Sequence, residues 1–240
     1  MKTKSIFALM LGMLLVLGAC NEKQEPENNN REEAPSFEGD EGSVEGHGWV
    51  NLGLPSGTLW AACNVGADSP EESGDYFAWG ETRTKARYAE DNYKYGANLY
   101  SLTKYCNRSD LGKNGLTDTL TVLEATDDVA TVKWGGHWRM PTMKEFEELY
   151  QKCSRDMITR SGKKGFLFTG PNGNSIFLPV TGTFGDNLTD DVNSGYYWSA
   201  SLDTSAPANA YRFVFQSETV NSHDRTYRCY GNAVRPVVKR

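Results

Sequence analysis

The chain lacks any apolar run long enough to cross a bilayer. Its main apolar stretch, Ile6 to Leu17, has about a dozen residues, whereas a membrane-spanning helix needs roughly 20. No later stretch is longer or more apolar. The sequence therefore predicts no transmembrane helix.

The motifs of common enzyme classes are missing as well. His47, His137 and His223 are the only histidines and show no His-Glu-x-x-His spacing, and neither a Gly-x-Ser-x-Gly elbow nor a phosphate-binding loop occurs. No two cysteines have the Cys-x-x-Cys spacing of a zinc site. Adjacent acids such as Asp127 and Asp128 more often cap a helix or lie in a solvated loop. We therefore expect no catalytic activity and no bound metal cofactor.

An excess of charge is also missing from most of the chain. The net charge is −6, to which the first 19 residues contribute +2 and residues 21–46 contribute −7, leaving −1 for residues 47–240. A nearly neutral domain has no electrostatic attraction to nucleic acid or to anionic lipid. Neither partner is expected.

The first 20 residues have the parts of a secretory signal. Lys2 and Lys4 precede the apolar stretch, and small residues lie directly before Cys20. Leu17-Gly-Ala-Cys20 resembles the lipobox of bacterial lipoproteins, in which the cysteine thiol is acylated. We expect residues 1–19 to be a signal peptide and Cys20 to be the lipidation site. This predicts a membrane partner through a lipid anchor and a place in the cell envelope, on the outer membrane with the protein surface-exposed. An ordinary signal peptide with a chance cysteine is the alternative.

We interpret residues 20–46 as the lipidated cysteine followed by an acidic, disordered tether. Nine acids and two bases lie between Asn21 and Gly46, with Phe37 as the one aromatic residue. Such a composition buries too little apolar surface to offset its ordering entropy. The remaining residues, 47–240, hold all six tryptophans and all twelve tyrosines, enough for one domain with a full hydrophobic core.

Four cysteines remain once Cys20 is set aside. In an exported chain, one or two disulfides are plausible, and four cysteines allow three connectivities. Free thiols in the core are the alternative. The candidate disulfide partners are Cys63, Cys106, Cys153 and Cys229.

Alternating apolar residues predict several strands. Residues 50–54 and 59–61 flank a Pro-Ser-Gly turn, and residues 166–168 and 176–178 flank Pro-Asn-Gly-Asn. Residues 211–215 and 234–238 alternate in the same way. Four long polar stretches, near 64–75, 106–118, 181–195 and 217–230, are predicted to be loops. The pattern predicts a twisted antiparallel sheet with long loops.

Two helices are expected in the middle of the domain. Thr142 and Glu145 form a capping box, after which an apolar stripe predicts a helix over about 142–153. A shorter helix is expected from Asp127 to Trp134, capped by Thr126 or Asp127 and stopped by Gly135 and Gly136. The fold class is therefore α+β.

Eight ordered blocks resemble one known family. They are Leu54-Pro-Ser-Gly-Thr-Leu-Trp-Ala61, Asn64-Val-Gly-Ala67, Gly74-Asp-Tyr-Phe-Ala-Trp-Gly-Glu81, Asp127-Asp128, Trp134-Gly-Gly-His-Trp-Arg-Met-Pro-Thr142, Ile176-Phe-Leu-Pro179, Gly195-Tyr-Tyr-Trp-Ser199 and Val234-Arg-Pro-Val237. Together they resemble the Fibrobacter succinogenes major paralogous domain family, which is similar to C-type-lectin-like domains and, distantly, to formylglycine-generating enzymes. The resemblance implies a lipoprotein of the Bacteroidetes type.

The resemblance implies a C-type-lectin-like α+β domain whose first and last strands pair. We expect several large residues of these blocks to be scaffold, with ligand contact as the alternative for the two arginines: Trp60, Trp79, Trp134, Trp138, Arg139, Trp198 and Arg235. The formylglycine-generating enzymes act through paired cysteines near the chain end, whereas Cys229 has no second cysteine close in sequence. An oxidase of that type is therefore the least favoured function.

A lectin-like scaffold with long loops favours a binding or adhesion module that recognises a glycan or a host or matrix protein. Tyrosines of a Tyr-rich run, which can stack on sugar rings, and polar loop residues are the candidate ligand contacts: Tyr93, Tyr95, Asp186, Asn187, Asp190, Asp191, Asn193, His223, Asp224 and Arg225. Covering of the core is the alternative role for the tyrosines.

The side-chain oxygens of residues 186–193 could also bind a structural calcium ion. The Glu-Pro-Asn, Gln-Pro-Asp and Trp-Asn-Asp triplets of calcium-dependent sugar binders are absent. A non-catalytic subunit of a surface assembly, such as a fimbria or a polysaccharide-capture complex, is the alternative function.

Overall fold

A computed structural model describes residues 37–189, 193–217 and 219–238. Its strands are β1 (Glu41–Val44), β2 (His47–Asn51), β3 (Leu59–Ala61), β4 (Trp138–Arg139), β5 (Ser154–Arg160), β6 (Lys163–Thr169), β7 (Ser175–Pro179), β8 (Thr183–Phe184), β9 (Leu188–Thr189), β10 (Ser194–Leu202), β11 (Asn209–Gln216), β12 (Thr219–Tyr227) and β13 (Val237–Val238). The helices are α1 (Val129–Trp134) and α2 (Met143–Lys152), with short 3₁₀ turns at Glu90–Asn92 and Lys113–Gly115. The expected α+β class is confirmed.

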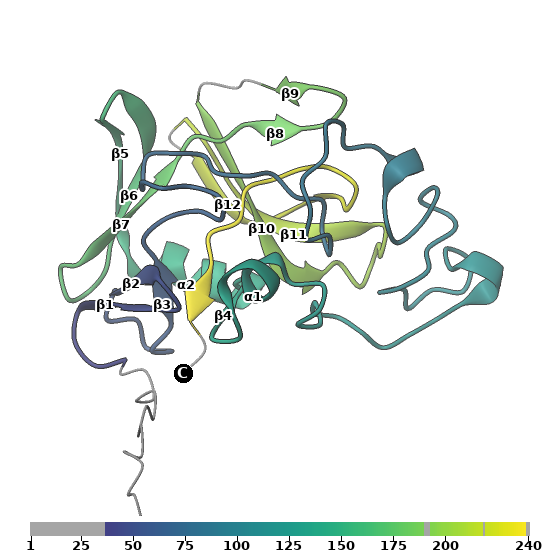
Figure 1. Cartoon of the computed structure of the whole chain (residues 1–240), viewed down its shortest axis with the longest axis horizontal. Helices are drawn as coiled ribbons and strands as arrows, with labels where there is room; N and C mark the ends of the chain where they lie inside the picture. Colours follow the sequence, from purple (N-terminus) through teal and green to yellow (C-terminus); the bar gives the residue numbers. More distant parts are fainter. Residues whose placement is uncertain (1–36, 190–192, 218, 239–240) are drawn as a thin grey trace, which may run out of the picture. The chain divides into compact units, whose positions relative to one another are not determined.

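The first sheet brings the two ends of the described domain together. Its strand order is β1-β2-β3-β13-β4, with every pairing antiparallel (Figure 1). The last strand therefore joins the sheet of the first strands, where it lies between β3 and β4. It does not pair with β2, because β1 and β3 already occupy both edges of β2.

Strand β1 lies within the stretch that composition assigned to the tether. It pairs with β2 from Glu41 opposite Val50 to Val44 opposite His47. Val44 is buried in the core. A Cβ on Gly42 would lie 2.5 Å from the Trp49 indole, so this strand needs a glycine where it crosses the ring. The ordered sheet thus begins before residue 47.

Two further three-stranded sheets have the orders β5-β6-β7 and β10-β11-β12. The β6–β7 hairpin and the alternation along β11 were predicted and are confirmed. Residues 219–227, predicted to be loop, instead form the edge strand β12, of which only Ser222 is buried. A strand at the edge of a sheet can leave most of its surface in water and can therefore be polar. For this reason the composition of β12 is like that of a loop.

Helix α2 forms as expected. The Thr142 hydroxyl accepts from the Glu145 amide, and the Glu145 carboxylate accepts from the Thr142 amide at 2.8 Å. Its buried residues Phe146 and Leu149 face the core, where the Phe146 ring stacks on Phe213 of β11 and lies 5.2 Å from Trp60 of β3. The helix thereby joins the first sheet to the β10-β11-β12 sheet.

Helix α1 has a different cap from the one expected. Asp128, rather than Thr126 or Asp127, accepts from the amides of Ala130 and Thr131, while Gly135 ends the helix. The Asp127 carboxylate is occupied elsewhere, since it accepts from Lys94 at 3.0 Å and from Lys104 at 2.6 Å.

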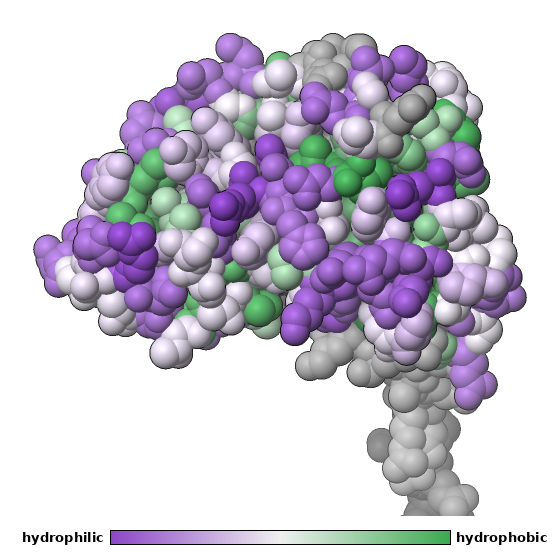
Figure 2. Space-filling model, turned by 180° about the vertical axis from the view of Figure 1, so that it is seen from behind, coloured by the Kyte–Doolittle hydropathy of each residue, from purple (hydrophilic) through white to green (hydrophobic). Residues whose placement is uncertain are grey.

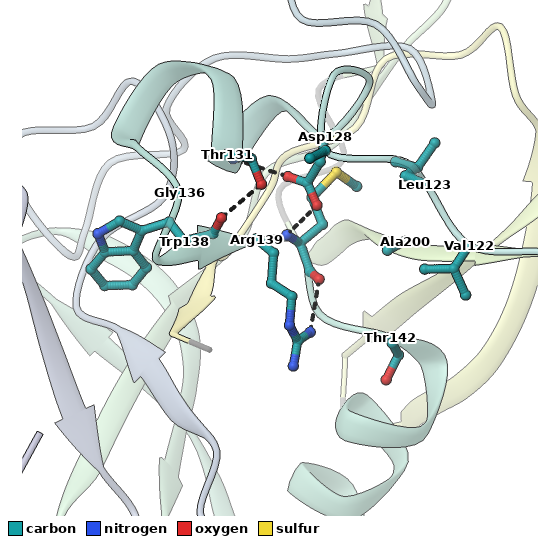
Figure 3. Close-up of a pocket in the computed structure, with 11 residues that line it drawn as sticks. Val122, Leu123, Asp128, Thr131, Gly136, Trp138, Arg139, Thr142 and Ala200 are labelled. Atoms are coloured by element: carbon teal, nitrogen blue, oxygen red, sulfur yellow. Dashed lines mark hydrogen bonds between the residues drawn. The ribbon is translucent and has the colours of Figure 1, made fainter. Parts of the chain in front are cut away.

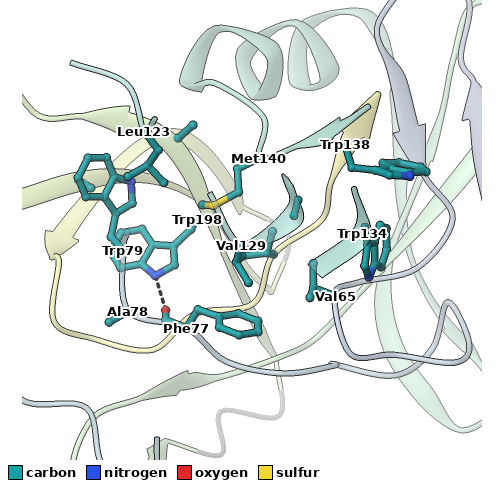
Figure 4. Close-up of a cluster of buried hydrophobic side chains, with 14 of the residues drawn as sticks. Val65, Phe77, Ala78, Trp79, Leu123, Val129, Trp134, Trp138, Met140 and Trp198 are labelled. Carbon is teal, nitrogen blue, oxygen red and sulfur yellow. Dashed lines mark hydrogen bonds between the residues drawn. The ribbon is translucent and has the colours of Figure 1, made fainter. Parts of the chain in front are cut away.

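The core has two clusters of buried side chains. One contains Trp79, Trp138 and Trp198 (Figure 4), and the other contains Trp60 with the phenylalanines of α2, β6 and β11. All five tryptophans expected in the scaffold are buried. On the face in Figure 2 hydrophilic residues predominate, and apolar residues form separate groups.

Two arginines, Arg228 and Arg235, are buried in the interior. Arg235 donates to the Asn64 side-chain oxygen at 2.7 Å and to the carbonyls of Ala61, Ala62 and Phe177. Arg228, which sequence reasoning did not single out, donates to the Tyr93 hydroxyl and to three carbonyls. Both guanidinium groups are therefore held by neutral acceptors.

The disulfide expectation is not met in the described structure. Cys63, Cys106, Cys153 and Cys229 are all free, and all but Cys63 are buried. The alternative of free thiols in the core describes Cys106, Cys153 and Cys229. Cys153 and Cys229 belong to the apolar clusters, where a small sulfhydryl packs like a hydrophobic residue, and the Cys106 thiol donates to the Arg108 carbonyl at 3.1 Å.

Candidate functional site

The two tyrosines expected to stack on a ligand are buried. The Tyr93 hydroxyl donates to the Trp79 carbonyl at 2.7 Å and accepts from Arg228 at 3.0 Å. The Tyr95 ring packs edge-on against Tyr93 and Tyr105. Burial raises the pKa of both hydroxyls. The ligand-contact prediction is wrong for both tyrosines, because their rings are needed to cover the core.

The described residues among the predicted contacts before β10 have separate partners or are exposed. Asp186 is exposed and forms a long ion pair with Arg87, 3.5 Å between Nη1 and Oδ1. Asn187 is exposed, and the Asn193 side chain accepts from Lys164 at 3.1 Å. Asp190 and Asp191 lie outside the described residues. A calcium site in this segment remains a prediction.

The predicted contacts at 223–225 lie on strand β12, not on a loop. Asp224 pairs with Arg212 at 2.6 Å, and Arg225 pairs with Asp203 at 3.1 Å. The His223 ring lies 3.7 Å from a Glu147 oxygen on α2. The three side chains contact different elements, and none of them lines the cavity described next.

A cavity of about 310 Å³ lies between α1, β4 and β10 (Figure 3). One wall is the segment 121–123, which runs beside β10 through the hydrogen bonds from Leu123 to Ala200 and from Leu202 to Thr121. The opposite wall is the turn from α1 into β4. The lining residues are Val122, Leu123, Ala125, Asp128, Thr131, Gly136, Trp138, Arg139, Met140, Thr142 and Ala200.

The apolar wall of this cavity ends at the surface. Leu123, Met140 and Ala200 are buried, whereas Val122 is 44% exposed. Sequence reasoning missed Val122 and Leu123, because the alternation at Thr119-Leu-Thr-Val122 is too short to stand out in a polar stretch. Only pairing with β10, distant in sequence, places them here.

Asp128 holds the polar wall of the cavity in place through three hydrogen bonds. Its Oδ1 accepts from the Ala130 and Thr131 amides, and its Oδ2 accepts from the Met140 amide at 2.8 Å. The carboxyl therefore ties the start of α1 to β4. Burial raises the pKa of Asp128 to about 6, against the three amide donors, which lower it.

The raised pKa of Asp128 implies a pH-dependent loss of stability. Between the ordinary pKa of 3.8 and about 6, the folded chain holds more protons at this group than the unfolded chain does. The free energy of unfolding contributed by Asp128 is therefore largest below pH 4 and falls as pH rises through 6.

Denaturant unfolding of the protein and of its Asp128→Asn variant from pH 4 to 7 tests this. The wild type minus variant difference in free energy should decrease over that range, because the asparagine does not titrate. A constant difference would show that the carboxyl titrates alike in both states. Other carboxyls, Asp127 among them, are common to both proteins and cancel.

Arg139 was expected to be scaffold, and it also lines the cavity. Nη1 donates to Glu145 Oε2 at 2.7 Å and to the Met140 carbonyl at 3.1 Å, and Nη2 donates to Glu145 Oε1. A guanidinium has five N–H donors. Nε–H and one Nη2–H thus have no partner among the described residues, and the side chain is 31% exposed.

The described residues offer little to metal or thiol chemistry. No three His, Cys, Asp or Glu side chains gather there in a way that could hold a metal ion. Burial raises the pKa of Cys153 and of Cys229 to about 11, which keeps both as unreactive thiols at neutral pH.

Comparison with known proteins adds no assignment. The chain matches no family model, and neither a curated protein nor a solved structure is significantly similar to it. The family resemblance carried by the eight sequence blocks therefore remains a prediction. Within the described residues, no helix is long and apolar enough to span a membrane.

Proposed function

We propose that this chain is a lipid-anchored binding module of the cell envelope that recognises a glycan through the cavity between α1, β4 and β10. The observation that carries the proposal is the pairing of an apolar wall, ending at the exposed Val122, with a polar wall that has unpartnered guanidinium N–H groups. Binding sites for small ligands combine apolar walls with a few fixed polar groups, in volumes from about 300 Å³ upward.

The proposal places the binding site away from the predicted loops. The tyrosines that were candidates for stacking are in the core, and the charged residues of β12 are paired. The proposal therefore assigns binding to the cavity. The binding role, the C-type-lectin-like relationship and the surface location rest on the sequence alone.

The lipid anchor rests on the leader and on Cys20. In a bacterial host, labelling with a radioactive fatty acid should mark the wild-type protein and the Cys63→Ser variant, and the label should be lost in Cys20→Ser. Two acyl chains bind a membrane stably, whereas one holds only weakly. Equal labelling of Cys20→Ser would refute the anchor.

Glycan recognition is tested with the Cys20→Ser protein, which cannot be acylated at that residue. We expect specific binding on an array of glycans, mucin and matrix proteins. Val122→Asp should weaken it at least tenfold, since it puts a charge on the apolar wall. Val132→Asp is the matched control, because Val132 is 51% exposed on α1 but does not line the cavity.

Three outcomes would contradict the proposal in different ways. If both valine substitutions weaken glycan binding equally, or if neither weakens it, the cavity is not the binding site. Binding to a matrix protein alone would reject a glycan ligand. Silence across the array, with the protein shown to be folded, would favour the non-catalytic subunit of a surface assembly, which should then co-purify with envelope proteins of its own cell.

A further inference from the structure

The polar wall of the cavity has hydrogen-bond donors and acceptors that the described residues do not fully use. Arg139 keeps Nε–H and one Nη2–H, which lie side by side on one edge of the guanidinium. Asp128 Oδ2 accepts one hydrogen bond, from Met140, and a carboxylate oxygen can accept a second. The Thr131 hydroxyl donates to the Trp138 carbonyl at 2.7 Å and can still accept. A ligand that both accepts and donates at neighbouring atoms fits these groups.

The charge of the wall disfavours a negative ligand. Arg139 is the one cation among the lining residues, and its charge is already met by Glu145. The buried carboxylate of Asp128 adds a negative charge that no cation pairs directly, because its three partners are backbone amides. Desolvation strengthens repulsion between like charges. A carboxylate placed on the free edge of Arg139 would meet this net negative charge.

The start of α2 gives no compensating anion site. Its capping box already places the Glu145 carboxylate on the Thr142 amide, and the Met143 amide donates to the Ser201 hydroxyl at 3.1 Å. The partial positive charge of the helix end is therefore used within the protein.

We propose that the cavity selects a neutral sugar residue, with two adjacent hydroxyls on the free edge of Arg139, over the corresponding sugar acid. This inference rests on the proposed function and adds the ligand class. One hydroxyl accepts from Nε–H and its neighbour from Nη2–H. The C–H face of the ring lies against Val122 and Leu123. Hydroxyls suit this wall because each is both a donor and an acceptor, and Asp128 Oδ2 and the Thr131 hydroxyl can still accept.

The test uses matched pairs of oligosaccharides that differ only in one terminal group, –CH₂OH in the neutral member and –COO⁻ in the uronic acid. Binding of each pair to the Cys20→Ser protein is measured by calorimetry at pH 7.5. We expect the neutral member of at least one pair to bind ten times more tightly than its acid.

Two variants link that preference to the cavity. Arg139→Lys keeps the charge beside Glu145 but loses the planar edge, and it should weaken binding of the neutral sugar at least tenfold. Arg83→Lys, an exposed arginine outside the cavity, should not. Because Arg139→Lys could also destabilise the fold, Val122→Asp and thermal melting of each variant accompany it.

The failures are distinguishable. Tighter or equal binding of the acid would overturn the inference and leave glycan recognition standing. A preference for the neutral sugar that survives both Arg139→Lys and Val122→Asp would overturn the placement of the ligand. Binding of neither member of any pair would overturn the proposed function and this inference with it.

Discussion

Replacing Arg235 with methionine should lower the free energy of unfolding by about 3 kcal/mol or more. The guanidinium is fully buried and donates to Asn64 and to the carbonyls of Ala61, Ala62 and Phe177. Methionine fills a similar volume but donates nothing, so three buried acceptors and the partly buried Ala62 carbonyl lose this donor, at about 1–3 kcal/mol for each acceptor left buried without a partner. Burial lowers the pKa of Arg235, and relief of that desolvation offsets part of the loss.

Denaturant unfolding measures this effect, and Arg83→Met is the matched control because Arg83 is exposed. A surface substitution of this kind usually changes stability by no more than about 0.5 kcal/mol. Equal stability of Arg235→Met and the wild type would mean that the buried charge costs as much as its hydrogen bonds contribute. The hydrogen bonds that link the C-terminal segment to β3 and β7 through Arg235 would then contribute nothing to the free energy of unfolding.

Trp138→Ala should be comparably destabilising, by about 3–5 kcal/mol. The indole is fully buried, packs edge-on against Trp134 at 5.1 Å and donates to the Val44 carbonyl at 3.1 Å. Its removal leaves a cavity in the first core cluster and frees the end of β1. Thermal melting should show a clear decrease for alanine.

Trp138→Phe is the graded control for that prediction. It keeps most of the ring volume and loses the N–H donor, so its effect should be less than half that of alanine. An unchanged melting temperature for Trp138→Ala would contradict the scaffold role of this residue. Equal effects of alanine and phenylalanine would assign the loss to the hydrogen bond rather than to packing.

Local patterns in the sequence were sufficient where the stabilising contacts are local. The capping box of Thr142 and Glu145 and the apolar stripe behind it specify α2, and short turns between alternating residues specify the β6–β7 hairpin. The α+β class follows from these elements. The cap of α1 was assigned to a neighbour of Asp128, because adjacent aspartates are equivalent until Lys94 and Lys104 occupy one of them.

Long-range contacts account for what the sequence did not reveal. Strand β12 is polar and is held by β11 and α2, so no internal pattern marks it. Tyr93 and Tyr95 are amphipathic, and their burial depends on Arg228 and on the tyrosines around them. The cavity needs segment 121–123 beside β10, about 80 residues further on. The motif Trp138-Arg-Met-Pro-Thr142 did point to its polar wall, as scaffold only.

An NMR titration tests the central claim most directly. Isotope-labelled Cys20→Ser protein is titrated with the neutral oligosaccharide that binds best on the array, and the backbone amides and the Arg139 Nε–H are followed. We expect the largest shifts at Val122–Ala125, Thr131 and the Arg139 side chain. Shifts confined to Asp186–Thr189 and Asn221–Arg225 would place the site at the two segments first predicted to bind, and would contradict recognition at the cavity.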